Sequence, residues 1–274
     1  MNVRIFLALV TVALACAAQP TPVAVSIPTE LTTYLSVLSY GTPEYDSALG
    51  SVSPGLSSTG ISPLLPYSVI LRNASSEFLR GFNVVFWVQN GGGTTLPYSF
   101  ASVELDGAKS GLLPPGGLRL VSILPAANHA VERNDVAGLT ALPPTMSAIS
   151  AMAAELGHSL SIQLTVEAIV TQNGAFIGPD RLGLLSRIQG EQSADAFIAA
   201  KLNAAGSLPA MVSALETLSA TPTDPSPNPF TRDFYSDRLA RTASELLTLI
   251  NAGTQSQPAN FASRVGRKIT VSRQ

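Results

Sequence analysis

The sequence predicts a mainly β protein with added α-structure, namely an immunoglobulin-like antiparallel β-sandwich followed by a C-terminal helical region. Three observations predict it. Up to residue 178, apolar and polar residues alternate in several short segments, which is typical of strands. After that residue, apolar side chains recur every three or four positions, which is typical of helices. The 274 residues are 46% hydrophobic and only 12% charged, so the chain can form a core and lacks the composition of a disordered protein.

Strands are predicted wherever the alternation is clear. Gly81–Gln89 places Phe82, Val84, Phe86 and Val88 on one face, which we expect to lie in the core. Six further strands are predicted at Leu31–Tyr40, Tyr67–Asn73, Pro97–Val103, Leu118–Leu124, Ser161–Thr171 and Ala175–Gly178. Seven short strands separated by turns favour a two-sheet sandwich of immunoglobulin-like type.

The longest alternation predicts the clearest strand and the turn after it. In Ser161–Thr171, Ile162, Leu164, Val166 and Val170 face one way. Asn173-Gly174 then predicts a two-residue hairpin turn, in which both residues have positive φ.

Two stretches interrupt the strand pattern. Gly41–Pro66 is rich in Ser, Gly and Pro and predicts a long surface loop. Ala126–His158 has no clean period, although its Ala-rich part, Met146–Leu156, predicts a short helix.

Helices are predicted after Gly178. Pro179 and Asp180 are typical of a first helical turn, and Gly190 is expected to kink or end that helix. Leu208–Leu218 predicts a second helix. Thr231–Ala252 predicts the strongest one, whose apolar stripe runs along Tyr235, Leu239, Thr242, Leu246, Leu249 and Ile250. On its solvent side we expect an ion pair between Asp237 and Arg241.

These patterns predict five segments. Residues 1–18 are a signal peptide, residues 26–178 the sandwich domain, and residues 179–252 a helical region packed on or beside the sandwich. Within the helical region, residues 221–229 contain four prolines and form a linker. Residues 253–274 are a basic tail that we expect to fray.

The N-terminal residues predict export to the periplasm or secretion. Arg4 precedes an apolar stretch too short to span a bilayer, and small residues up to Ala18 suit cleavage before Gln19. Cys16, the one cysteine of the chain, offers an alternative as a lipid anchor, because the residues before it resemble a lipoprotein box. We expect no transmembrane segment in the mature chain.

Charge and motifs predict neither an enzyme nor a cofactor. The net charge of −2 argues against a nucleic-acid partner. His129 and His158 lie far apart, so neither a catalytic nor a metal site is predicted, and both are expected on surface loops. The polar cluster Glu132–Asp135 is interpreted as a solvated turn rather than a binding site. Trp87 is interpreted as a packing residue rather than a platform for a carbohydrate.

The C-terminal tail has four basic residues and no acidic one. Such a tail offers contacts to anionic lipid or to an acidic partner, although we interpret it as solvated. The four residues are Arg264, Arg267, Lys268 and Arg273.

One run of the sequence resembles a group of exported bacterial proteins of unknown function. The run consists of a strand over Gln163–Thr171, an Asn-Gly hairpin, a short strand, and Gly178-Pro179-Asp180 before a helical tail. The segments YSVILRN and GFNVVFWVQ, which begin at Tyr67 and Gly81, look similar to the same group. The resemblance covers about half the chain; it implies an immunoglobulin-like core and no catalytic residues.

Three functions are compatible with these observations. The favoured one is a non-catalytic binding or structural module of the cell envelope or extracellular space, with an envelope protein or a glycan as its partner. The second is an extracytoplasmic hydrolase, which needs His129 or His158 near a Ser and a carboxylate in a cleft. The third is a protein that docks a partner through its C-terminal helices, which needs an exposed apolar stripe. The exposure of Leu246 separates the last from the others.

Overall fold

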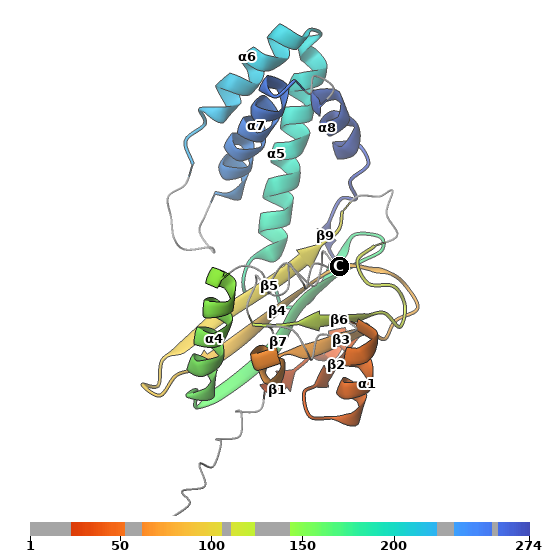
Figure 1. The fold of residues 1–274 in the computed structure, drawn as a ribbon. Helices are drawn as coiled ribbons and strands as arrows, with labels where there is room; N and C mark the ends of the chain where they lie inside the picture. The colour runs from red at the N-terminus through yellow and green to blue at the C-terminus, as the bar shows by residue number, and fades with distance from the viewer. Residues whose placement is uncertain (1–22, 53–61, 106–110, 124–142, 224–232, 254–256) are drawn as a thin grey trace, which may run out of the picture.

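The computed structural model describes residues 23–52, 62–105, 111–123, 143–223, 233–253 and 257–274. Two largely antiparallel sheets are combined with several helices, which confirms the predicted combination of β-structure with α-structure. The helices after β8 lie together at one end of the molecule, and the two sheets lie at the other (Figure 1).

The larger sheet, sheet A, has the order β5-β4-β7-β8-β9, and β1 pairs in parallel with β7. Its strands are β1 (Val23–Ser26), β4 (Leu79–Gln89), β5 (Thr95–Val103), β7 (Ser161–Thr171), β8 (Ala175–Ile177) and β9 (Ser272–Arg273). The smaller sheet, sheet B, has the order β2-β3-β6. Its strands are β2 (Leu35–Ser39), β3 (Val69–Asn73) and β6 (Leu118–Val121). β1 and β9 are absent from the seven predicted strands.

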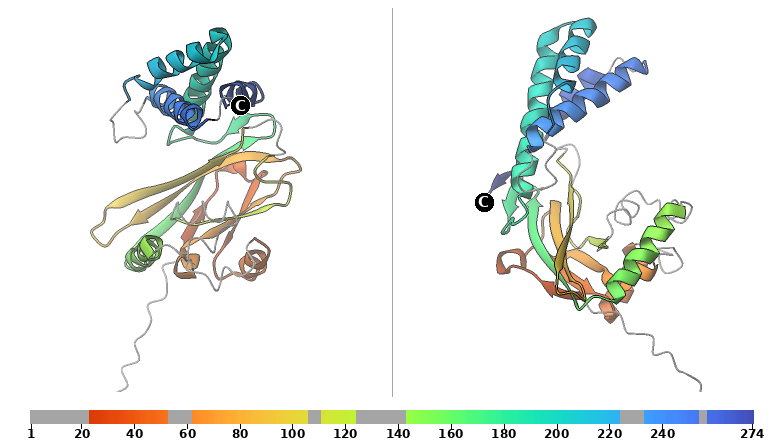
Figure 2. Two further views of the ribbon diagram at one scale, coloured as in Figure 1. Left: turned by 45° about the horizontal axis from the view of Figure 1, so that its top comes forward. Right: turned by 90° about the vertical axis from the view of Figure 1, so that its left-hand side faces the viewer.

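Two helices and two short 3₁₀ segments accompany the sheets, and four helices form what we call the helical unit. The first group consists of η1 (Thr29–Leu31), α1 (Pro43–Val52), η3 (Ser62–Tyr67) and α4 (Pro143–Gly157). The helical unit consists of α5 (Leu184–Ala205), α6 (Leu208–Ser219), α7 (Phe234–Asn251) and α8 (Gln257–Val265). Figure 2 shows the unit projecting from one end of the sheets.

The main core lies between the two sheets. It joins Val69 and Leu71 of sheet B to residues of sheet A in one apolar cluster. The predicted inward face of β4 is confirmed, because Phe82 and Phe86 are fully buried in this cluster. Val85 points to the opposite face and is also fully buried, so the outer face of sheet A is covered at this position as well.

The alternation predicted for β7 breaks at Glu167. Val84 pairs with Val166 and Asn83 pairs with Ala168, so Glu167 is an extra residue in a β-bulge. A bulge reverses the faces of all later residues, and Val170 therefore lies in an outer apolar cluster rather than in the main core as predicted.

The turn after β7 also differs from the predicted two-residue type. Asn173 does not have positive φ, whereas Gly174 has a φ of 83°. The Gly174 N–H donates to the Thr171 carbonyl over 3.0 Å, so three residues connect β7 to β8. Three-residue loops with glycine in the left-handed position are common in hairpins.

Three predictions on chain segments are wrong. The predicted loop Gly41–Pro66 contains α1, which packs on sheet B by burying Tyr45. The Tyr45 hydroxyl lies 2.7 Å from the Ser68 Oγ, and burial raises the pKa of Tyr45 to about 12. Gly190 does not end a helix, since α5 continues through it. The tail expected to fray forms α8 and then β9, which pairs in parallel with β8.

The first C-terminal helix starts later than predicted. Pro179 and Asp180 precede α5, which begins at Leu184. Asp180 has a φ of 54°, and its carboxylate accepts from the backbone N–H of Leu184 at 2.6 Å and of Leu185 at 3.2 Å. Asp180 thus caps the helix from outside by binding two of its unpaired N–H groups.

Candidate binding crevice

The helical unit meets the outer face of sheet A through the first turns of α5. Leu184 and Ile188 of α5 pack on Val170 and Phe176 of the sheet in an apolar cluster of their own. The rest of α5 extends away from the sheets and is surrounded by α6, α7 and α8, with a separate apolar core. This arrangement leaves hollows where the helices leave the sheet.

One hollow, which we call the main crevice, has a volume of about 610 Å³. β5 and the residues just after it form one wall, and α5, α7 and α8 form the others. A second hollow of about 260 Å³, the side crevice, shares Ala101, Leu184, Arg187 and Glu191 with the main one. The two crevices therefore adjoin, and the main crevice has the size of a typical ligand pocket.

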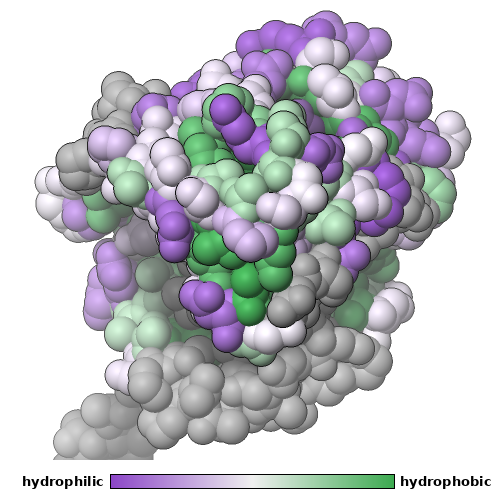
Figure 3. Space-filling model, turned by 90° about the horizontal axis from the view of Figure 1, so that it is seen from above, coloured by the Kyte–Doolittle hydropathy of each residue, from purple (hydrophilic) through white to green (hydrophobic). Residues whose placement is uncertain are grey.

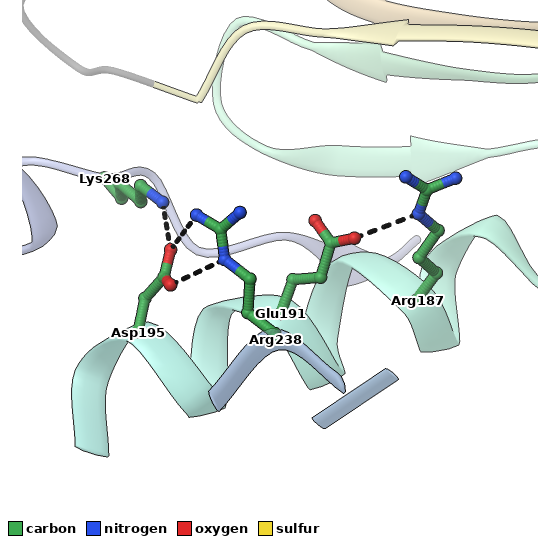
Figure 4. Close-up of polar contacts among 5 residues, drawn as sticks. All are labelled: Arg187, Glu191, Asp195, Arg238 and Lys268. Atoms are coloured by element: carbon green, nitrogen blue, oxygen red, sulfur yellow. Dashed lines mark hydrogen bonds and ion pairs between the residues drawn. The ribbon is translucent and has the colours of Figure 1, made fainter. Parts of the chain in front are cut away.

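An ion-pair cluster around Asp195, drawn in Figure 4, lines the main crevice. The Asp195 side chain is only 1% exposed. Its carboxylate accepts two hydrogen bonds from Arg238, at 2.8 and 3.0 Å, and one from the Lys268 Nζ at 2.5 Å. Burial by itself would raise the pKa of Asp195, but the hydrogen bonds from Arg238 and Lys268 outweigh it, and the pKa is lowered. Asp195 thus stays ionised and ties α5 to α7 and to the residue segment after α8.

A more exposed ion pair also lines the main crevice. The Arg187 Nε donates to the Glu191 carboxylate over 3.0 Å, one helical turn away on α5 (Figure 4). The Arg187 guanidinium also lies 5.8 Å from the centre of the Phe234 ring. The crevice walls therefore present both signs of charge.

Two buried polar atoms on the crevice walls have no hydrogen-bond partner. The Asn83 Oδ1 belongs to a β4 residue that lines the side crevice, and the Thr242 Oγ1 belongs to an α7 residue that lines the main one. Asn83 and Thr242 are 3% and 4% exposed. A buried polar group without a hydrogen-bond partner costs about 1–3 kcal/mol of stability. A ligand that forms a hydrogen bond with either atom would therefore recover part of this free energy.

The residues that the sequence singled out lie mostly elsewhere. His158 is exposed at the end of α4 and lines neither crevice, whereas His129 and Glu132–Asp135 fall outside the described residues. Within the described ranges, no group of three or more His, Cys, Asp or Glu is arranged to hold a metal ion. Trp87 is half-buried on the outer face of sheet A, between Pro97 and Gln163 of the adjacent strands.

Three of the four basic residues near the C-terminus bond within the chain. Lys268 binds Asp195, the Arg267 Nη1 donates to the Ser263 Oγ, and the Arg273 Nη2 donates to the Gly178 carbonyl over 2.8 Å. Arg264 lines the main crevice.

The ion pair predicted between Asp237 and Arg241 was expected on the solvent side of the helix. This location is wrong for Asp237, because Asp237 is 9% exposed and lines the side crevice.

Asp195 and Arg238 were not singled out from the sequence, and Lys268 was expected to be solvated. Arg238 and Lys268 lie 43 and 73 positions after Asp195 in the chain. One local signal exists. Asp195 lies seven residues from both Ile188 and Leu202, so it is a charge within the buried stripe of α5. A buried charge requires a partner, although the sequence does not say which.

The chain was compared with protein-family models, curated proteins and solved structures, and no significant match was found in any of the three. In the part of the chain that the structure describes, no helix has the combined length and apolar character needed to cross a membrane.

Proposed function

We propose that this protein is an exported, non-catalytic binding module of the cell envelope, and that the crevice between sheet A and the helical unit is its binding site. The unpaired Asn83 Oδ1 carries the proposal, because it is a buried polar atom in the wall of the side crevice, which adjoins the main crevice of ligand size. The charges of the main crevice support binding rather than catalysis. Asp195 already accepts three hydrogen bonds from cations, so it is poorly suited to accept a proton from a substrate.

The proposal includes an immunoglobulin-like sandwich as the scaffold. The orders β2-β3-β6 and β5-β4-β7-β8 support it, since they correspond to strands A-B-E and C′-C-F-G of that fold. In this correspondence β8 is the last strand of the sandwich, and the helical unit is an addition to it.

Export is supported by the N-terminal sequence, with Arg4 before a short apolar stretch and small residues up to Ala18. Expression of the full chain in a bacterium, followed by cell fractionation and mass analysis of the N-terminus, tests it. We expect an exported protein beginning at Gln19. A lipid on Cys16 would favour anchoring instead, and a cytoplasmic protein that retains Met1 would contradict export.

Site-specific cross-linking tests the binding site. A photoreactive amino acid at Leu249, which lines the main crevice and is 41% exposed, should form an adduct in the producing cells. The same group at Tyr40, which is 46% exposed and lies just after β2, is the matched control. An adduct of discrete mass at Leu249 and none at Tyr40 is expected. Equal labelling at both positions, or none at either, would contradict the proposed site.

Docking of a partner on the helical unit is a second candidate. Leu246 is buried, so the apolar stripe of α7 packs within the chain. On α6, however, only Leu215 is buried, and Leu208, Met211 and Val212 are half-buried. Figure 3 looks onto the helical unit and shows apolar side chains gathered near the middle of this face, with hydrophilic ones around them. This surface favours contact with an apolar partner.

A further inference from the structure

The outer edge of β5 has a hydrogen-bonding pattern that can be worked out from its neighbours. At the two ends of the β4–β5 pair, the Asn90 N–H donates to Thr94 and the Glu104 N–H donates to Arg80. In an antiparallel pair, hydrogen-bonded positions alternate with positions that point away. Even-numbered residues of β5 therefore bond to β4, and odd-numbered ones direct their backbone N–H and C=O groups to the outer edge.

The outward groups of Ser99, Ala101 and Val103 have no partner in the described part of the chain. Both ends of this stretch are closed. Pro97 is also an outward position and has no N–H, which is a common protection of edge strands. At the other end, the Leu105 carbonyl already accepts from the Ile269 N–H over 2.9 Å.

The hydrogen bond between Ile269 and Leu105 shows that another backbone segment can pair with the chain at this edge. Residues Ile269–Val271, which we call the C-terminal strap, run from the end of β5 to β9 and are held to α5 by Gln189 and Gln192. A backbone N–H of the strap thus already pairs with the outer edge of β5, immediately beyond its unpaired stretch.

The unpaired edge borders the crevices. Ser99 and Ala101 line the side crevice, and Ala101 and Val103 line the main one. α7 and α8 form the opposite wall of the main crevice, with Leu249 and Arg264 among its lining residues. A strand laid along β5 would place every second side chain on the crevice side, because successive side chains point to opposite faces.

We propose that β5 binds an extended segment of a partner protein, which adds as a further strand beside Ser99–Val103 and places side chains in the main crevice. This inference rests on the proposed function and names the class of partner. Outward backbone groups that repeat every two residues, about 7 Å apart, are matched by an extended polypeptide. A single strand fits beside the walls formed by α7 and α8, whereas a second copy of the chain would bring its own helical unit against them.

Selection of peptides tests the proposal. A displayed library of random short peptides is selected on the folded protein, and the enriched peptides are measured by fluorescence polarisation. Ser99→Pro removes one outward N–H at an exposed edge position that tolerates proline, and it should weaken binding about tenfold or more. The matched control, Ser99→Ala, keeps the N–H and should therefore bind the peptide about tenfold or more tightly than Ser99→Pro does.

A second measurement uses the unaltered protein, so it does not depend on the folding of Ser99→Pro. N-methylation of the selected peptide, one residue at a time, should abolish binding at every second position, because only alternate N–H groups face β5. Loss of binding without this alternation, equal binding to both Ser99 variants, or no enriched peptide would overturn strand addition. Dimerisation through β5, seen as a concentration-dependent mass that Ser99→Pro abolishes, would overturn it in favour of a second copy. Cross-linking at Leu249 decides the proposed binding site independently of these results.

Discussion

Replacing Asp195 with Asn should destabilise the protein through the ion-pair cluster that joins α5, α7 and the segment after α8. The substitution keeps the size of the side chain but removes its negative charge. Arg238 and Lys268 then lose the anion that balances them in a buried setting. Removing one partner of a buried ion pair generally costs about 3–5 kcal/mol.

The exposure of the two cations places the cost at the lower end of that range. The side chains of Arg238 and Lys268 are 25% and 28% exposed, so water can replace part of what they lose. We therefore expect the free energy of unfolding to fall by about 3 kcal/mol. For a chain of this length, that corresponds to a decrease in Tm of roughly 6–12 °C.

Thermal unfolding followed by circular dichroism at pH 7 measures the effect. Glu191→Gln is the matched control, because it removes a carboxylate from an exposed pair on the same helix and should cost less than about 0.5 kcal/mol. A change for Asp195→Asn as small as that of the control would refute the reasoning.

The pH dependence gives a second check. The folded state lowers the pKa of Asp195 below its ordinary value of 3.8. Its contribution to stability is therefore full above that value and is lost as the pH falls through the lower, folded-state pKa. The difference in stability between the wild type and Asp195→Asn should be constant near neutral pH and should close in strong acid. A difference that persists there would mean that the carboxylate charge is not its cause.

Three other perturbations have defined outcomes. Phe86→Ala should lower the free energy of unfolding in denaturant by about 3–5 kcal/mol, because Phe86 is fully buried, and a loss under about 1 kcal/mol would contradict its place in the core. Gly174→Ala should cost well over 1 kcal/mol, since its Cβ would meet a carbonyl of the C-terminal strap, whereas Gly253→Ala, also at positive φ but in open space, should cost about 1 kcal/mol. Limited proteolysis should cut within Thr221–Pro229, and a first cut between Gly178 and Leu185 would contradict the packing of α5 on the sheet.

Strands could be predicted where apolar residues recur at every second position. β4 and β7 lie close to their predicted bounds for this reason, although both strands are buried on both faces over much of their length. The predicted alternation of faces is wrong after Glu167, because a β-bulge changes the two-residue period there and no residue type in the sequence indicates a bulge. β9 has two residues, too few for any period. α1 had a signal, with Tyr45 and Ala48 at helical spacing, but the surrounding Gly, Ser and Pro residues favoured a loop.

The binding site was beyond prediction for a different reason. Its walls come from β5, α5, α7 and α8, and the sequence does not specify how these elements meet. The partnership of Asp195 with Lys268 depends on the return of the chain to the sheet, and the basic composition of that segment indicated solvent exposure instead. Asn83 follows Phe82 and therefore lies on the opposite face of β4, yet the lack of a partner for its Oδ1 depends on the elements packed around it, which the sequence does not specify.

The return of the chain to β9 fixes the helical unit at two points. It leaves the sheet after β8 and rejoins it at β9, which are neighbouring strands. A body held at one point turns in any direction, whereas one held at two points turns only about the line between them. Both points lie at the edge of sheet A that is opposite to β5. The hydrogen bond from the Ile269 N–H to the Leu105 carbonyl, just after β5, is a third tie, and any rotation about the line between the first two points would have to break it.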